Sequence, residues 1–401
     1  MSISTDDSFI NLVHESFLNF RGGDLQGPEK NYQDLKEVIP DVSYYVSDVQ
    51  RLINYADEHP DFFSSSFGGI AISVLANRVL TSTDTLYCKP NLQHPEIKRY
   101  ADGFYLGKFL KKGQVIFRGD SCQEIGYAMK GGKIVVEGKH NCLKYPGEGI
   151  GSKMKGGEIV IKQGILDIQK SGIQVGENMT DGKITIAGDV DGSAGGSMTG
   201  GVIYIKGNLG SLGYDFSGGL ITIDGDLLAD DIPHYGCNGG EIRIKGAFRG
   251  GDVGRSMNGG KVYINKYAGN PMYGIGNEMK RGAIEIGKAE VPCDIGNNME
   301  GGEINFNGDC DTVGTRMYGG KINIAGDVKR SLGHAMRSGK IHVRGNVNSV
   351  GCNMEGGTIH ISGSITNDIH SFHGGVIYFK GKRLSINNPI SRFFTNLKLK
   401  K

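Results

Sequence analysis

Histidine and cysteine recur at one position of a repeat toward the C-terminal end of the chain. Thr315, His334, Cys352 and His370 follow one another at intervals of 19, 18 and 18 residues. If each interval is one turn of stacked parallel strands, successive side chains lie about 4.8 Å apart. Imidazole and thiolate groups at that spacing can share a metal ion such as zinc. His334, Cys352 and His370 are therefore the candidate metal ligands, and zinc is the candidate cofactor.

The alternative interpretation is that these residues are ordinary polar side chains at an exposed corner. The same position of the earlier repeats carries polar or aromatic residues that have no common metal chemistry: Tyr127, Ser152, Glu177, Tyr214, Tyr235, Arg255, Asn277 and Asn297. His342 and His360 add imidazoles on a neighbouring strand, and His373 is close by in sequence.

Other motifs of enzyme chemistry are missing from the sequence. There is no Gly-x-Ser-x-Gly elbow for a serine nucleophile and no P-loop. The seven cysteines lie far apart without a Cys-x-x-Cys pair, so no iron-sulfur cluster or structural zinc site of that kind is expected. The sequence thus predicts no catalytic or cofactor-binding residues. A stand-alone enzyme that uses the N-terminal segment or the His/Cys corner is kept as an alternative.

A glycine-anchored repeat has to position all of these residues. Each anchor is followed two and four residues later by an aliphatic residue or Phe, and the residue three before it is a hydrophobe, usually Met. The fourteen anchors are Gly113, Gly132, Gly157, Gly182, Gly201, Gly219, Gly240, Gly260, Gly282, Gly302, Gly320, Gly339, Gly357 and Gly375.

The apolar alternation after each anchor predicts a short strand with one buried face. A strand that recurs every 18 to 25 residues with glycine turns between is typical of a solenoid. A single turn buries too few side chains to fold alone, so the repeats are expected to form one stack of parallel strands. We therefore predict an all-β solenoid of about 14 coils, in which the Met column fills the core.

The repeat unit resembles a known family. Residues 314–327, Gly-Thr-Arg-Met-Tyr-Gly-Gly-Lys-Ile-Asn-Ile-Ala-Gly-Asp, are similar to the GXGXG repeat, and the resemblance covers about residues 103–381. This family includes the C-terminal domain of the glutamate synthase large subunit and the repeat-bearing subunit of formylmethanofuran dehydrogenase. The resemblance implies a right-handed parallel β-helix. It also implies a non-catalytic scaffold within a multi-subunit metabolic enzyme of the oxidoreductase type, with protein subunits as partners.

The two ends of the chain do not repeat. Residues 1–100 contain helical patterns from Phe9 to Leu18 and from Val46 to Tyr55, followed by an apolar stretch from Gly68 to Leu80. We expect a mostly α-helical module that caps the solenoid or docks on a partner, because a solenoid end exposes unpaired strand edges. The predicted domains are this module, the solenoid at 101–382, and a basic and apolar tail at 383–401.

Composition bounds the remaining functions. The net charge is +2, which gives no reason to expect nucleic acid or a membrane surface as a partner. The sequence has no long apolar run and begins without the features of a secretion signal, so we expect a cytoplasmic protein. A homo-oligomeric structural protein is the further alternative.

Overall fold

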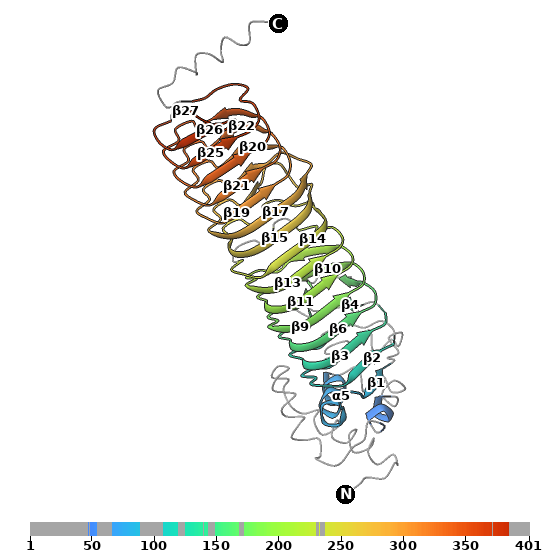
Figure 1. Ribbon diagram of the computed structural model, residues 1–401. Helices are drawn as coiled ribbons and strands as arrows, with labels where there is room; N and C mark the ends of the chain where they lie inside the picture. Colours follow the sequence, from blue (N-terminus) through green and yellow to red (C-terminus); the bar gives the residue numbers. More distant parts are fainter. Residues whose placement is uncertain are drawn as a thin grey trace. The chain divides into compact units, whose positions relative to one another are not determined.

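The computed structural model describes most of the repeat region (Figure 1). The described residues are 47, 49–53, 66–88, 107–118, 125–138, 140–142, 149–167, 172–229, 232, 237–370 and 372–384. They belong to two compact units, unit 1 at residues 1–207 and unit 2 at residues 208–401. Each unit is a β-solenoid, and the turns number about 12.

Unit 1 pairs its repeat strands in parallel, in the order of the sequence. These strands are β1 (Thr85–Cys88), β2 (Gln114–Phe117), β3 (Lys130–Val136), β6 (Lys155–Ile161), β9 (Asp181–Ile186) and β11 (Thr199–Ile205). A second set of short parallel strands comprises β4 (His140–Cys142), β5 (Gly149–Ile150), β7 (Ile165–Asp167), β8 (Gln174–Val175) and β10 (Val190–Ala194). The predicted parallel stacking is confirmed.

Unit 2 repeats this arrangement. Its long sheet contains β13 (Gly218–Ile223), β14 (Glu241–Phe248), β15 (Asn258–Tyr267), β17 (Arg281–Ala289), β19 (Glu303–Phe306), β21 (Lys321–Ile324), β23 (Lys340–Val343), β25 (Thr358–Ile361), β26 (Val376–Phe379) and β27 (Lys382–Leu384). Its shorter strands are β12 (Leu209–Leu212), β16 (Gly274–Ile275), β18 (Asp294–Ile295), β20 (Cys310–Val313), β22 (Val328–Leu332) and β24 (Val347–Val350).

Methionine and glycine columns fit together across neighbouring turns. Met299 is fully buried, and a Cβ added at Gly320, the anchor of the next turn, would lie 2.7 Å from the Met299 Cε. Gly320 also has a φ of +87°, a left-handed conformation that favours glycine. The anchor glycine thus leaves space for the methionine of the preceding turn, which explains why the two residue types recur together.

The coil count differs from the prediction at the C-terminal end. The last anchor, Gly375, is followed by β26, but β27 then pairs antiparallel with β26, with Tyr378 opposite Arg383. The chain reverses at this point, so the last anchor opens a hairpin in place of another solenoid turn. The number of turns is about 12, lower than the about 14 coils that the anchors predict, and the hairpin accounts for the last anchor.

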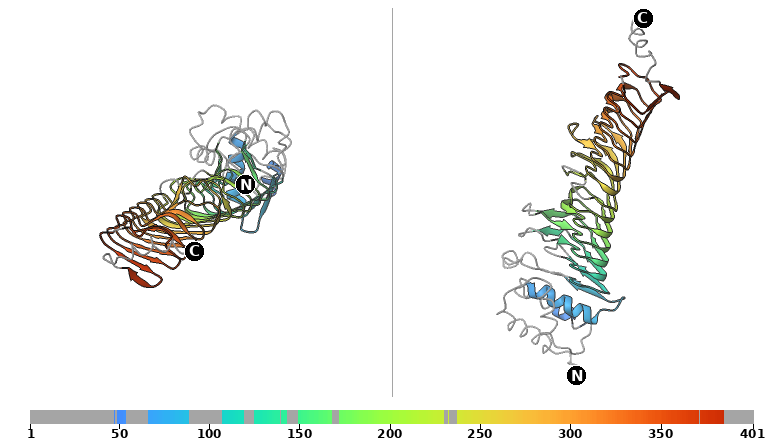
Figure 2. Two further views of the ribbon diagram at one scale, coloured as in Figure 1. Left: turned by 90° about the horizontal axis from the view of Figure 1, so that it is seen from above. Right: turned by 90° about the vertical axis from the view of Figure 1, so that its left-hand side faces the viewer.

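A helix covers the first turn of unit 1. Helix α5 (Ser66–Val79) arises from the apolar stretch expected there, and Figure 2 shows it beside β1 and β2. The Asn77 side-chain amide donates to the Lys108 carbonyl at 3.3 Å, while its oxygen accepts from the Lys111 backbone N–H at 3.0 Å. Asn77 thereby satisfies the hydrogen-bonding capacity of two backbone groups in the first turn, which is what a capping element is expected to do.

The remaining N-terminal predictions are described only in part. Residues 47 and 49–53 are helical, with Val49, Leu52 and Ile53 buried. The helix expected from Phe9 to Leu18 and the tail from residue 385 onward lie outside the described residues. Strand β1, which pairs with β2, was not predicted. Within the described chain, no helix has the length and apolar character needed to cross a bilayer.

Candidate functional site

The three predicted metal ligands lie at one corner of unit 2, in successive turns. The Arg316 N–H donates to the His334 carbonyl at 2.8 Å, and the Ala335 N–H donates to the Cys352 carbonyl at 2.8 Å. The residue before each methionine has a positive φ, for example 53° at Arg316. This conformation turns its N–H toward the next turn, so the corner is held by a continuous ladder of backbone hydrogen bonds.

The side chains at this corner differ in how far they are exposed. His334, Cys352 and His370 are half-buried, and His373 is exposed. In the described ranges, no three His, Cys, Asp or Glu side chains are grouped so as to hold a metal ion. The zinc site at His334, Cys352 and His370 stays a prediction for metal analysis to test.

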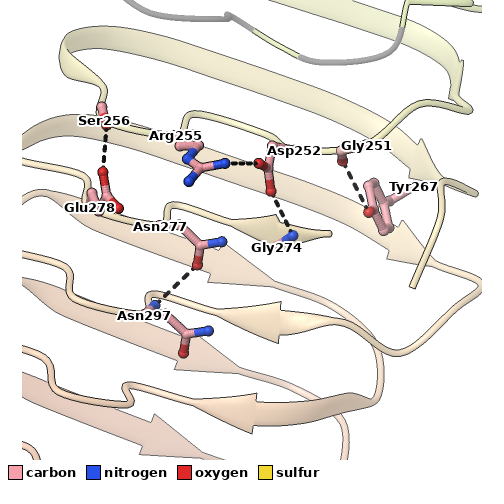
Figure 3. Close-up of polar contacts among 9 residues, drawn as sticks. All are labelled: Gly251, Asp252, Arg255, Ser256, Tyr267, Gly274, Asn277, Glu278 and Asn297. Carbon is pink, nitrogen blue, oxygen red and sulfur yellow. Dashed lines mark hydrogen bonds and ion pairs between the residues drawn. The ribbon is translucent and has the colours of Figure 1, made fainter. Parts of the chain in front are cut away.

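A polar network occupies the same corner further upstream (Figure 3). Asp252 is only 5% exposed, and its two carboxylate oxygens accept from the Gly274 N–H at 2.8 Å and from Arg255 at 3.2 Å. The Tyr267 hydroxyl donates to the Gly251 carbonyl at 3.3 Å. These bonds tie the loop that precedes β16 to the turn before it, which gives Asp252 a structural role.

Amide side chains continue this network into the following turns. The Asn297 N–H donates to the Asn277 Oδ1 at 3.3 Å, and the Asn297 Nδ2 donates to Asp294 at 3.3 Å. The other oxygen of Asp294 accepts from the Thr312 hydroxyl at 2.6 Å. These bonds connect neighbouring turns and stabilise the corner, although the buried Asn297 Oδ1 has no hydrogen-bond partner among the described residues.

The outer face of the long sheet in unit 2 offers a different kind of surface. In each strand one of the side chains that point away from the core lies in register with its counterparts on the neighbouring strands. This outer column comprises Thr222, Arg243, Tyr263, Glu285, Asn305, Asn323, His342, His360 and Tyr378. All nine are exposed or half-buried.

Neighbours in the outer column contact one another. The Asn323 Nδ2 donates to the Asn305 Oδ1 at 2.7 Å. The rings of His342 and His360 meet edge to face at 6.2 Å, and the ring of His360 stacks on Tyr378 at 4.6 Å. These contacts limit the rotamers of the column, so its polar groups are held at the spacing of the strands.

Two shallow hollows lie along the outer column. The larger, of about 590 Å³, is lined by Glu285, Asn305, Asn323, His342 and Arg344 around the small residues Gly287 and Ala325. The smaller, of about 550 Å³, is lined by Arg243, Lys245, Lys261 and Tyr263 beside Ala283. Glu285 and Asn305 border both. The sequence analysis did not predict these hollows. Small residues at outward positions, such as Gly287, Ala325 and Ala283, were the signal that could have indicated them.

Burial and hydrogen bonds between turns shift several titratable groups of both units. Burial raises the pKa of the Cys237 thiol to about 11 and that of Cys293 to about 12, so neither is a ready nucleophile. A hydrogen bond from Lys133 lowers the pKa of Glu158, and one from the Asp327 N–H lowers that of Asp309. These carboxylates link neighbouring turns.

Comparisons with protein-family models, with curated proteins and with solved structures found no match to the chain. The outer column and its two hollows are thus the features from which a function can be inferred.

Proposed function

We propose that the chain is a non-catalytic scaffold subunit of a multi-subunit metabolic enzyme complex, of the kind built on the GXGXG repeat. In this proposal the solenoid is a right-handed parallel β-helix in a cytoplasmic complex, and residues 1–100 form a cap or docking module. The observation that carries the proposal is the outer column of unit 2, whose side chains lie in register on nine neighbouring strands.

A surface of this kind suits the binding of other subunits. Its nine strands extend over roughly 40 Å at about 4.8 Å per strand. The contacts between Asn305 and Asn323 and between His360 and Tyr378 already order the side chains. Less conformational entropy is then lost when a partner binds. The two hollows can accept protruding side chains of a partner, and their polar walls provide hydrogen-bond groups that orient it.

Ion pairs between adjacent turns are consistent with a rigid scaffold. Lys133 pairs with Glu158 at 2.8 Å, and Lys321 pairs with Glu303 at 2.8 Å, in each case across adjacent strands. Such exposed pairs contribute only about 0.2 to 1 kcal/mol each. They do, however, favour one register of the strands over shifted ones, which keeps binding groups at constant distances.

Co-purification of the full chain from its native source tests the proposal. Mass spectrometry should find oxidoreductase or amidotransferase subunits in stoichiometric amounts. The variant Asn305→Arg/Asn323→Arg fills the larger hollow and should reduce partner recovery. The control variant Tyr204→Arg introduces arginine at the equivalent outward position of β11 in unit 1, and it should leave partner recovery unchanged. If the chain is recovered without partner subunits and catalyses a reaction on its own, the scaffold proposal is wrong and the stand-alone enzyme is the better hypothesis.

A further inference from the structure

A basic face ends the long sheet of unit 2. His342, His360, Tyr378 and Arg383 are cross-strand partners on β23, β25, β26 and β27, at the red end of the chain in Figure 1. Lys340 and Arg344 flank His342 on the same side of the sheet. These six residues are defined here as the basic face: Lys340, His342, Arg344, His360, Tyr378 and Arg383.

The positive charge of the basic face is not neutralised nearby. Lys340, Arg344 and Arg383 are exposed and form no ion pair with any residue of the described chain. Their strands carry no Asp or Glu. Of the carboxylates on this side of the sheet, Glu303 on β19 is paired with Lys321 at 2.8 Å, and Glu285 on β17 borders the same hollow as Arg344 without an ion pair to it. The face is therefore a local positive potential on a chain whose net charge is only +2.

The aromatic rings of the basic face contact one another. His360 and Tyr378 stack with an interplanar angle of 5°, so each ring uses a face on the other. Bases of single-stranded nucleic acid bind by stacking on free aromatic faces, whereas carboxylates bind to N–H and O–H groups at ring edges and to Arg and Lys. This arrangement favours an acidic polypeptide as the occupant.

The chain itself contains an acidic segment of opposite charge. Residues 1–46 have eight carboxylates, with only Arg21, Lys30 and Lys36 as basic residues; the eight are Asp6, Asp7, Glu15, Asp24, Glu29, Asp34, Glu37 and Asp41. Residues 380–401 have seven Lys and Arg residues and no Asp or Glu. The two ends of one sequence are thus complementary in charge.

We infer that the basic face binds the acidic N-terminal segment, residues 1–46, of a second copy of this chain. The contact joins the C-terminal end of one copy to the N-terminal end of the next, so it is heterologous. Copies joined in this way form a ring if the rotation closes and a linear assembly if it does not. The inference goes beyond the proposed scaffold function because it requires no other subunit.

Sedimentation of the purified full chain tests the inference. At about 0.1 M salt the average mass should rise with protein concentration. It should fall toward the monomer at about 1 M salt, where the screening length shortens from about 10 Å to about 3 Å. The variant Lys340→Glu/Arg344→Glu/Arg383→Glu should weaken association at least tenfold. The matched control Lys130→Glu/Lys155→Glu/Lys206→Glu changes the same charge on exposed lysines of unit 1 and should associate like the parent chain.

A reciprocal variant checks that the two named segments meet. Asp34→Lys/Glu37→Lys/Asp41→Lys should also weaken self-association, and mixing it with the basic-face variant should restore association between unlike copies. Circular dichroism should show unchanged strand content in every variant. A chain that is monomeric at all concentrations overturns the inference, even if single-stranded RNA binds the face. The inference is also overturned if association does not depend on salt, or if the control variant weakens it as much as the basic-face variant does. A third contrary result is that mixing the two charge-reversed variants fails to restore association.

Discussion

The imidazole ring of His360 lies flat against the phenol ring of Tyr378, with centroids 4.6 Å apart and planes inclined by 5°. On the other neighbouring strand, the ring of His342 lies nearly perpendicular to that of His360, and its Nε2 lies 3.4 Å from the Ser362 hydroxyl. Partial burial, followed by the proximity of His360, Arg344 and Lys321, lowers the pKa of His342. The outer column therefore affects protonation as well as packing.

The lowered pKa of His342 predicts a pH dependence of stability. The native state binds this proton less readily than the unfolded chain, whose usual pKa is 6.5. The contribution of His342 to the free energy of unfolding is therefore fully present above pH 6.5. It is lost as the pH falls from 6.5 through the lowered pKa of the native state. The loss of melting temperature between about pH 8 and about pH 5 should be smaller in His342→Gln. In His360→Gln, an NMR titration should show the pKa of His342 raised; an unchanged value contradicts the assigned contact.

The anchor glycine Gly320 should not accept a side chain. Gly320→Ala combines left-handed strain of about 1 to 2 kcal/mol with overpacking against Met299, which costs about 1 to 3 kcal/mol. Gly381→Ala is the matched control, because Gly381 has a φ of +77° but a Cβ there meets no described atom within 4 Å. Urea unfolding should show that Gly320→Ala loses more free energy of unfolding than Gly381→Ala. Equal losses would mean that strain alone requires the glycine.

The Met column should behave as packed core. Met317 is fully buried, and its Cε would lie 2.7 Å from a Cβ at Gly339 in the next turn. Met317→Ala should lower the free energy of unfolding by about 2 to 5 kcal/mol because it leaves a cavity. Met317→Leu, of similar volume, should cost less than about 1.5 kcal/mol. Denaturant titration separates the two, and a mild effect of alanine would indicate a loosely packed column.

Metal analysis tests the corner at His334, Cys352 and His370. A zinc site at this corner predicts about one equivalent of zinc in the purified chain, and His334→Ala/His370→Ala should lose it. No bound metal in either chain would exclude the site. Elemental analysis after exposure to zinc and gel filtration gives the answer. A full equivalent that the double variant loses would show that the side chains rotate to meet a metal ion.

Buried thiols should resist alkylation. Burial raises the pKa values of Cys237, Cys293 and Cys310, and all three side chains are at most 1% exposed. At about pH 8 iodoacetamide should therefore modify them only in denaturant, since the thiolate is the reactive form. Half-buried Cys352 should react first of the four. Peptide mass spectrometry distinguishes the sites, and early modification of Cys310 would indicate opening of its turn.

The sequence was sufficient for most of the solenoid because each column has one dominant cause. Buried isoleucines such as Ile304, Ile322 and Ile341 pair directly across strands, and the alternation that predicted them is the alternation of a pleated strand. Most anchor glycines have a positive φ together with a close approach of a methionine from the preceding turn. These requirements are local and recur in every turn, so they are visible without a structure.

Other features depend on contacts that a repeat pattern does not encode. Arg316, Ala335 and Asn353 all adopt a positive φ at equivalent corner positions, although their residue types differ. Hydrogen bonds to the next turn stabilise this conformation at Arg316 and Ala335, so no common side chain marks it. The hollow around Gly287 likewise depends on which side chains meet across several strands. The corner of His334 and Cys352 was foreseen, but not how their side chains are disposed.

The reversal of the chain at Gly381 has a consequence for how this protein can change in length. Each turn bonds mainly to the turns before and after it, and the β26–β27 hairpin pairs with the last turn through β25. Duplication or deletion of one unit, such as residues 339–356, should leave the hairpin intact. It would displace the C-terminal end by one step of about 4.8 Å. Gene rearrangement could therefore adjust the length of the outer column in whole steps, without a new fold having to evolve.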